Sequence, residues 1–371
     1  MSKVYFPNLN GLRFVAAILV LIHHVEQFKK IMNLPNYFDN TIINNLGKFG
    51  VNLFFVLSGF LITFLLLTEK NRSNTISVSK FYKRRILRIW PLYFLLIILS
   101  FFIFPEIEIL QINNISNQIH DNFISKIVLF IFFLPNLCLG VFAPVLFASQ
   151  MWSIGYEEQF YLIWPWILKN IKKARIFLIF LFVCFLTIKT LLLFVFKDFL
   201  ISINFYEKIV LLFDFPSFDS LLIGGFFAYL VFEKNQTIKF VYKPYFQVII
   251  YLSLFYIVIN NCYLTLVINQ IYAIIFGLII INLSNGKTTI LNIENKIVNY
   301  LGQITYSLYM FHAVIIVLVL NVFEKIKYHN IYIEYFIIIT LTILFSILSY
   351  EFFEKYFINL KEKYKNNEET N

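Results

Sequence analysis

The stretch Asn10-Gly11-Leu12-Arg13 through His23-His24-Val25-Glu26 places ionisable side chains at both ends of an apolar segment. Arg13 and His24 are eleven residues apart, with nine apolar residues between Arg13 and the histidine pair. On an α-helix, eleven steps of about 100° return to within roughly 20° of the same face after a rise of about 16 Å. Because ionisable groups in a bilayer are costly and usually face a functional site, this stretch predicts a first membrane helix with Arg13 and His24 on one face.

The composition predicts an all-α, polytopic membrane protein. Of the 371 residues, 60% are hydrophobic and 14% charged, whereas soluble domains average about half apolar and a quarter charged. The mean hydropathy is +0.75. A net charge of +10 could suit nucleic acid, but the basic residues sit in loops between apolar segments, which is typical of positive-inside topology. We therefore expect a lipid bilayer and no nucleic acid as partner.

Apolar windows predict about ten transmembrane helices, each with uncertain ends. The expected spans are 12–28, 50–67, 86–104, 156–168, 176–196, 218–232, 246–260, 264–283, 299–321 and 331–350. A further apolar segment, 126–147, contains Pro135, Gly140 and Pro144, and hydropathy alone leaves open whether it crosses fully or is re-entrant.

The distribution of basic residues favours a broken or re-entrant segment at 126–147. If it does not cross and the N-terminus is cytoplasmic, 22 of the 31 Lys and Arg residues lie on the cytoplasmic side. A full crossing would place the basic cluster 169–175 outside, against the positive-inside rule. We therefore expect both termini inside, a membrane-embedded domain over 1–350 and a cytoplasmic tail over 351–371.

Several classes of site are not indicated by the sequence. The three cysteines, Cys138, Cys184 and Cys262, are scattered in apolar surroundings, with neither a disulfide framework nor zinc spacing, so no metal is expected. The first apolar run lacks a small-residue cleavage site, so we expect it to remain as a span. Glycine-rich phosphate loops, G-x-S-x-G and His-Glu-x-x-His are not found.

Arg13 and His24 also have structural interpretations. An arginine at the end of a span commonly extends to the interface, and a buried histidine can simply bond a neighbouring helix. His23 points some 100° away from His24. His24 is favoured as the functional residue because it shares the face of Arg13.

The basic loop ending Lys83-Arg84-Arg85-Ile86-Leu87-Arg88 places Arg85 and Arg88 three residues apart on one helix face. Paired guanidiniums bind phosphates well, which suggests a phosphorylated cytoplasmic cofactor. Anionic lipid headgroups are the alternative ligand.

The segment Trp152-Ser153-Ile154-Gly155-Tyr156-Glu157-Glu158 opens an aromatic run with two adjacent carboxylates. On the expected topology it lies toward the outer leaflet, at a depth similar to that of His24. A glutamate near a histidine can orient the imidazole and stabilise its charged form, the usual support for a general base.

Weaker candidates are the small residues of 50–60, Asp219, Lys189 and His312. Small residues in a span most often allow close helix packing. For Asp219 and His312 a structural role is favoured over direct chemistry.

Five of these motifs occur in an order that resembles the acyltransferase 3 family of integral membrane O-acyltransferases. They are Gly11-Leu12-Arg13 with His24 after ten further residues, Phe54 to Phe60, Arg85-x-x-Arg88, Trp152-Ser153-x-x-x-Glu157, and Ser307-Leu308-Tyr309-x-x-His312. The resemblance spans about residues 6–350. It implies an acyl-coenzyme A donor, usually acetyl-coenzyme A, that enters from the cytoplasm, and an acceptor hydroxyl on a glycan or lipid-linked sugar at the outer face.

By this resemblance, His24 is the catalytic base or acyl-relay residue, with Arg13 and Glu157 as the other catalytic candidates. Arg85 and Arg88 correspond to the pair implied in coenzyme A binding. Two departures stand out: Asn10 replaces a frequent Asp, and Ser217 stands where many members have Arg two residues before Asp219. No appended esterase-like domain is found in the sequence.

The expected function is transfer of an acyl group, with acetyl favoured, from coenzyme A to a hydroxyl of a cell-surface saccharide or its lipid-linked precursor, in the bacterial inner membrane. Two alternatives remain. A transporter or flippase would also place ionisable residues along a substrate path. A noncatalytic partner in polysaccharide assembly would not need His24.

Overall fold

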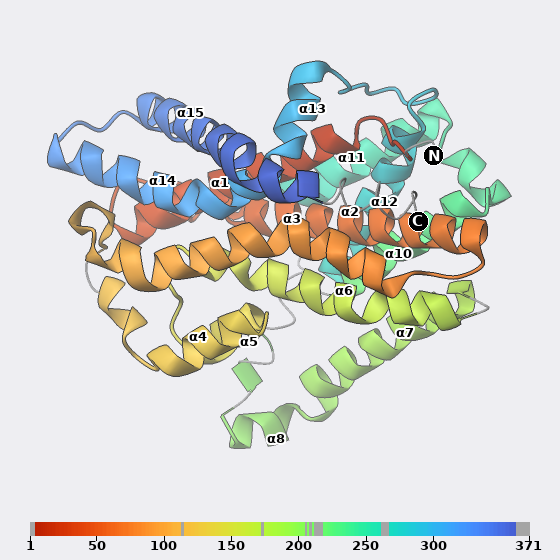
Figure 1. Cartoon of the computed structure of the whole chain (residues 1–371), viewed down its shortest axis with the longest axis horizontal. Coiled ribbons are helices and arrows are strands. Elements are labelled where there is room, and N and C mark those ends of the chain that lie inside the picture. Colours follow the sequence, from red (N-terminus) through yellow and green to blue (C-terminus); the bar gives the residue numbers. More distant parts are fainter. Residues whose placement is uncertain are drawn as a thin grey trace. The chain divides into compact units, whose positions relative to one another are not determined.

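The computed structural model describes residues 4–112, 115–171, 174–204, 206–207, 210, 218–260 and 267–360. Over these residues the fold is all-helical, without a β-strand, as the composition predicts (Figure 1). Ser217, Cys262 and residues 361–371 of the expected tail lie outside the described residues.

The helices alternate long apolar segments with short connectors. They are α1 (Leu9–Ile31), α2 (Thr41–Ser73), α3 (Val78–Ile98), α4 (Phe123–Ile131), α5 (Pro135–Val141), α6 (Trp152–Asn170), α7 (Ala174–Thr190), α8 (Lys197–Ser202), α10 (Phe218–Phe232), α11 (Pro244–Asn260), α12 (Ile268–Asn285), α13 (Lys296–Gln303), α14 (Thr305–Lys325) and α15 (Ile331–Ser349). Turns of π-helix extend α3, α7 and α15 over Leu99–Ile103, Leu191–Val195 and Tyr350–Glu354.

Seven of these helical segments are long and apolar enough to cross a membrane, which makes the chain a multi-pass membrane protein. They are Leu9–Ile31, Thr41–Ser73, Val78–Glu106, Ala174–Val195, Ile268–Asn285, Thr305–Lys325 and Ile331–Leu360. α10 and α11 are shorter apolar helices. The expected span 299–321 covers parts of two helices, α13 and α14, and the first three residues of 264–283 lie outside the described residues. The other expected spans fall on helical segments, but the number of crossings stays a prediction. The last helical segment continues to Leu360, so the tail boundary at 350 also stays a prediction.

The apolar segment 126–147 is broken before Pro135, as its prolines predict, whereas Gly140 lies within α5. α4 ends at Ile131, and α5 begins with Pro135 as its first residue. The residue before a proline is disfavoured in helical conformation, and Leu134, directly before Pro135, has a non-helical φ of −115° and ψ of 35°. Phe133 has a positive φ of 58°. The helix therefore stops and restarts within this segment.

The chain forms two compact units. The first comprises residues 1–19, 45–76 and 159–302, and the second comprises 20–44, 77–158 and 303–371. α1, α2 and α6 each contribute residues to both units.

In the first unit, small residues let α2 and α10 approach closely. A Cβ added at Gly59 would lie 2.0 Å from the carbonyl oxygen of Leu221, and one at Gly224 would lie 2.2 Å from that of Val56. Either substitution would force the helix backbones apart. Gly59, one of the small residues of 50–60, thus has the close-packing role that the sequence favours.

In the second unit, α14 and α15 lie side by side, joined by a short connection (Figure 1). α14 also contacts α3 and the segment Ser149–Met151 before α6. Of the 21 residues of α14, most are buried, including the polar residues Ser307 and His312.

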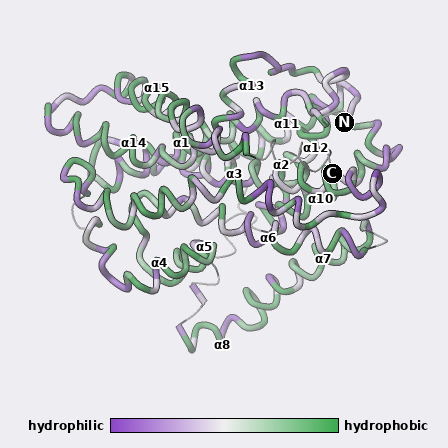
Figure 2. The backbone as a smooth tube through the Cα atoms, in the orientation of Figure 1, coloured by the Kyte–Doolittle hydropathy of each residue, from purple (hydrophilic) through white to green (hydrophobic). Residues whose placement is uncertain are grey.

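Several helices present apolar side chains outward. α11 exposes Ile249, Leu252, Phe255 and Tyr256, each more than half accessible. Hydrophobic residues dominate the helices, while hydrophilic residues gather at their ends and in the connecting segments (Figure 2). Such outward apolar faces are expected where the surrounding solvent is lipid.

In the first unit, Glu294 binds the residues that directly precede α1. Its carboxylate accepts hydrogen bonds from the Tyr5 hydroxyl, from the Asn8 N–H at 2.5 Å and from the Asn299 amide at 2.6 Å. Partial burial acts to raise the pKa of the Glu294 carboxyl, but these three hydrogen bonds outweigh it and hold the pKa below its usual range. The folded state therefore favours the carboxylate form.

We predict that Glu294→Gln destabilises the protein at neutral pH and that this difference shrinks as the pH falls. A carboxyl whose pKa is lower in the folded state contributes stability above its unfolded pKa, near 4.5, and loses that contribution as the pH falls through the folded value. Thermal unfolding in detergent from pH 3.5 to 7 measures the difference. Glu106→Gln, at an exposed position, is the control. A constant difference across this range would contradict the prediction.

Candidate active site

His24 lies on α1, which is unbroken from Leu9 to Ile31, so Arg13 and His24 share one helix as predicted. Arg13 belongs to the first unit and His24 to the second. The histidine is half-buried, and its Nδ1 lies 3.0 Å from the carbonyl oxygen of Val20, one turn earlier.

The structure brings His312 of α14 against His24. The Nε2 atom of His312 lies 3.0 Å from Nδ1 of His24, and the two ring centroids are 4.8 Å apart. His312 is only 1% exposed, and its Nδ1 lies 2.6 Å from the carbonyl oxygen of Tyr309. The sequence favoured a structural role for His312, whereas its position makes it the direct neighbour of the candidate catalytic residue.

Tyr309 links this histidine pair to the Trp-Ser motif. Its hydroxyl donates to the carbonyl oxygen of Gln150 at 2.6 Å and lies 2.7 Å from Oγ of Ser153. The side-chain amide of Gln150 donates in turn to the carbonyl oxygen of Met310 at 3.1 Å. The motifs around Ser153 and His312, which are 159 residues apart in sequence, therefore meet in one buried polar network.

Other polar residues at the start of α14 bond to further elements. The Tyr306 hydroxyl donates to the carbonyl oxygen of Ile89 on α3 at 2.8 Å. The Ser307 hydroxyl donates to Glu354 in the π-helical turn after α15. α14 thus connects α1, α3, the start of α6 and the end of α15 through side chains of one short motif.

The two glutamates of α6 have different surroundings. Glu158 accepts a hydrogen bond from the Trp90 indole at 3.0 Å, and its other carboxylate oxygen is buried without a hydrogen-bond partner among the described residues. Glu157 is half-buried, and its charge acts on Tyr306 and Tyr309. Within the described residues, the hydrogen bonds of His24 go to Val20 and His312, so the expected pairing of Glu157 with the imidazole is not seen.

Arg85 and Arg88 lie on α3, and each guanidinium is close enough to one carboxylate to interact with it electrostatically. The half-buried Arg85 is near Glu158, and its guanidinium lies over the Phe81 ring, 5.6 Å from the centroid. Arg88 is exposed, and its charge acts on Glu354. Sequence reasoning missed both carboxylate neighbours, because they come from elements about 70 and 270 residues away.

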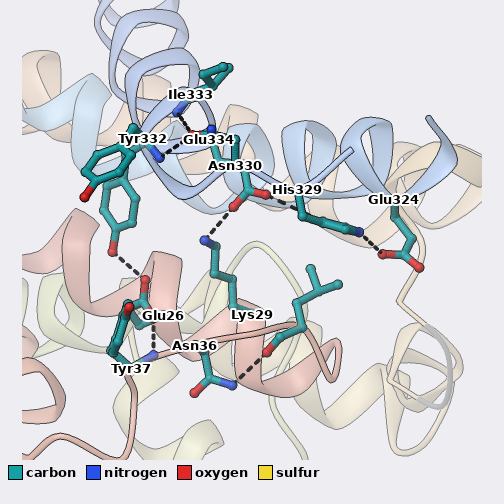
Figure 3. Close-up of polar contacts among 12 residues, drawn as sticks. Glu26, Lys29, Asn36, Tyr37, Glu324, His329, Asn330, Tyr332, Ile333 and Glu334 are labelled. Atoms are coloured by element: carbon teal, nitrogen blue, oxygen red, sulfur yellow. Dashed lines mark hydrogen bonds and ion pairs between the residues drawn. The ribbon is translucent and has the colours of Figure 1, made fainter. Parts of the chain in front are cut away.

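Beyond His24, the end of α1 is fastened to α15 by buried polar contacts (Figure 3). Lys29 and Glu334 form an ion pair at 2.5 Å with side chains 3% and 5% exposed. Glu26, fully buried, accepts from the Tyr335 hydroxyl at 2.7 Å and from the N–H of Tyr37 at 2.5 Å. Glu26 and Lys29, which make these contacts, lie within five residues of His24. The contacts therefore hold in place the end of α1 that carries His24.

His329 lies beside two carboxylates in the same region. Its Nε2 lies 3.4 Å from Glu324, and its Nδ1 lies 3.6 Å from Glu334 (Figure 3). Both acidic partners come from the α14–α15 region. Glu334 therefore joins the buried Lys29 to the more exposed His329.

In the described part of the chain, no three His, Cys, Asp or Glu side chains are grouped closely enough to hold a metal ion. The groups in contact with His24 are the imidazole of His312, the carbonyl oxygen of Val20 and the ring of His23, whose centroid lies 5.1 Å from that of His24. This arrangement can take up and return a proton and can orient a reacting hydroxyl.

The fold and site thus define a multi-pass helical protein with a histidine in its membrane region. Residues 6–351 match the model of an acyltransferase domain, and the chain belongs to this acyltransferase 3 family. The match covers the span expected from the sequence motifs.

The chain is similar to several bacterial proteins. A Staphylococcus aureus (strain COL) protein provisionally named an O-acetyltransferase is 29% identical over 385 residues, covering 94% of this chain and 57% of the relative. O-acetyltransferase OatA of Staphylococcus aureus (strain NCTC 8325) is 26% identical, covering 95% and 57%. Peptidoglycan O-acetyltransferase OatA of Listeria monocytogenes is 33% identical over 171 residues, covering 44% and 24%. The chain thus spans little more than half the length of these staphylococcal relatives. No solved structure matches it.

We predict that Glu334→Gln lowers the free energy of unfolding by about 3–5 kcal/mol, because it leaves the buried Lys29 ammonium without its partner. The double variant Lys29→Met with Glu334→Gln should recover most of this loss. Unfolding in detergent measures both. The exposed ion pair Lys30–Asp39, also at 2.5 Å, is the matched control, and Asp39→Asn should cost only about 0–1 kcal/mol. Equal losses for Glu334→Gln and Asp39→Asn would contradict the prediction.

Proposed function

We propose that this protein is a membrane O-acetyltransferase that moves an acetyl group from acetyl-coenzyme A to a hydroxyl of a cell-surface saccharide or its lipid-linked precursor. The observation that carries the proposal is the contact between His24 and His312 at 3.0 Å in a chain of the acyltransferase 3 family. It supplies an oriented, half-buried imidazole on a long apolar helix. Such a group suits proton transfer from an attacking hydroxyl.

The proposed donor site is the Arg85–Arg88 face of α3. Coenzyme A carries several phosphates, and arginine binds phosphate through parallel hydrogen bonds. Glu158 and Glu354, which neighbour the two guanidiniums, would hold them in place before the donor binds. We propose that this face is cytoplasmic and that both termini are cytoplasmic, in keeping with the loop charges.

The proposed acceptor is a glycan hydroxyl, which the names of the relatives support: one of them is a peptidoglycan O-acetyltransferase. We place the protein in the bacterial cytoplasmic membrane. There the acetyl group would pass from a cytoplasmic donor to an acceptor toward the outer face. The tail 351–371 is proposed to be cytoplasmic.

In the proposed reaction, His24 takes the proton of the acceptor hydroxyl as its oxygen attacks the thioester carbonyl carbon. The new C–O bond forms, the C–S bond breaks, and the departing coenzyme A sulfur takes the proton back from the imidazole. The products are the acetyl ester and free coenzyme A thiol. Glu157 and Arg13 are proposed to assist, Glu157 through the tyrosine hydroxyls on which its charge acts.

We predict that His24→Ala lowers acetyl transfer by about 10²–10⁴-fold, the usual contribution of a general base. Membranes that contain the protein would be given radiolabelled acetyl-coenzyme A, and label in glycan or lipid-linked sugar would be counted. His120→Ala, at an exposed histidine, is the control. Equal label from His24→Ala and wild type would contradict the role of His24. Binding of a saccharide precursor without acetyl transfer or coenzyme A binding would favour a transporter instead.

We predict that the double variant Arg85→Gln with Arg88→Gln raises the KM for acetyl-coenzyme A by about tenfold or more, while kcat changes little. Losing charge-assisted hydrogen bonds made equally in the ground and transition states weakens binding alone. Initial rates over a range of donor concentrations separate the two constants. Arg84→Gln, on a different face of the same helix, should leave KM near the wild-type value. An unchanged KM in the double variant would place the donor elsewhere.

A further inference from the structure

We infer that His312 is a positioning residue that fixes the tautomer of His24, so that Nε2 of His24 is the atom that accepts the proton. This inference rests on the proposed function for its consequence in catalysis. The tautomer itself follows from hydrogen-bond chemistry alone.

The first step concerns His312. Its Nδ1 lies 2.6 Å from the carbonyl oxygen of Tyr309, and a carbonyl oxygen can only accept a hydrogen bond. Nδ1 of His312 must therefore carry a proton. In a neutral imidazole the other nitrogen is then an acceptor, so Nε2 of His312 presents a lone pair. That lone pair faces Nδ1 of His24 at 3.0 Å.

The second step concerns His24. Its Nδ1 has two neighbours, Nε2 of His312 and the carbonyl oxygen of Val20, each at 3.0 Å. Both are acceptors, so both contacts require a proton on Nδ1 of His24. One shared N–H satisfies them together, and the lone pair of neutral His24 is left on Nε2. The backbone of α1 and the side chain from α14 thus select the same tautomer.

The opposite arrangement fits poorly. If His312 were an imidazolium, its Nε2–H would donate to Nδ1 of His24, and the contact between that nitrogen and Val20 would lose its proton. It would also place a positive charge on a side chain that is 1% exposed and lies among apolar residues of α14. The neutral chain of hydrogen bonds satisfies these three contacts, Val20 with His24, His24 with His312 and His312 with Tyr309, with one proton on each ring.

This order has a chemical consequence. When Nε2 of His24 takes the proton of the acceptor hydroxyl, the new imidazolium still donates from Nδ1 to His312 and Val20. Its charge is therefore stabilised without moving either partner. The same atom, Nε2, would attack the thioester if the acetyl group were relayed through His24.

The test compares two replacements of His312. In His312→Gln, the side-chain carbonyl can accept from Nδ1 of His24, whereas in His312→Met nothing can. We expect His312→Met to lower kcat by about tenfold, the scale of one neutral hydrogen bond, with the KM for acetyl-coenzyme A unchanged, and His312→Gln to restore most of kcat. Met310→Leu, on the same helix, controls for packing changes, and thermal unfolding in detergent checks that each variant is folded.

A spectroscopic measurement decides the tautomer without reference to activity. Solid-state nitrogen-15 spectra of the protein labelled at its five histidines, with His24 assigned by difference from His24→Gln, should show His24 protonated at Nδ1. A proton on Nε2 of His24, or full kcat in His312→Met, would overturn the inference. Wild-type protein that shows the Nδ1 proton but transfers no acetyl group would overturn the proposed function and leave the tautomer assignment standing.

Discussion

A charged or polar side chain inside an apolar helical protein must find its partner within the chain, and this constraint shapes the second unit. Lys29 and Glu334 are almost fully buried, and each is tolerated because it neutralises the other. Their ion pair joins the end of α1 to the start of α15. Because α15 lies beside α14, the same contact helps to hold α1 where His24 meets His312.

α14 is the element through which the site is assembled. Four residues, Tyr306, Ser307, Tyr309 and His312, lie within a stretch of seven positions, yet their partners come from four separate parts of the chain. On a helix, these positions spread over more than one face, which lets one short motif reach several neighbours. The motif therefore serves packing and chemistry together. A substitution in it would therefore change the packing of α14 as well as its polar contacts.

The sequence predicts much of the fold because its signals are local. Apolar length predicts the long helices, and the prolines of 126–147 predict its break before Pro135. The spacing of Arg13 and His24 follows from helical periodicity once α1 is known to be continuous. The partner of His24 could not be found this way, because 288 residues separate it from His312 and no periodicity relates the two. Glu157 and Glu158 show a second limit: adjacent residues point about 100° apart, and only packing decides which meets Trp90.

The expected partner of His24 was a carboxylate, and the difference from the observed imidazole matters for mechanism. A carboxylate beside an imidazole stabilises its charged form before any substrate arrives, and in an apolar region this would add a second buried charge. Toward His24, a neutral His312 imidazole accepts a hydrogen bond and carries no charge, so it orients His24 without adding a buried charge. In the proposed mechanism, positive charge then develops on His24 only as the proton moves. A site in which the imidazole becomes charged only during proton transfer would suit the proposed reaction between a thioester and a hydroxyl within a membrane.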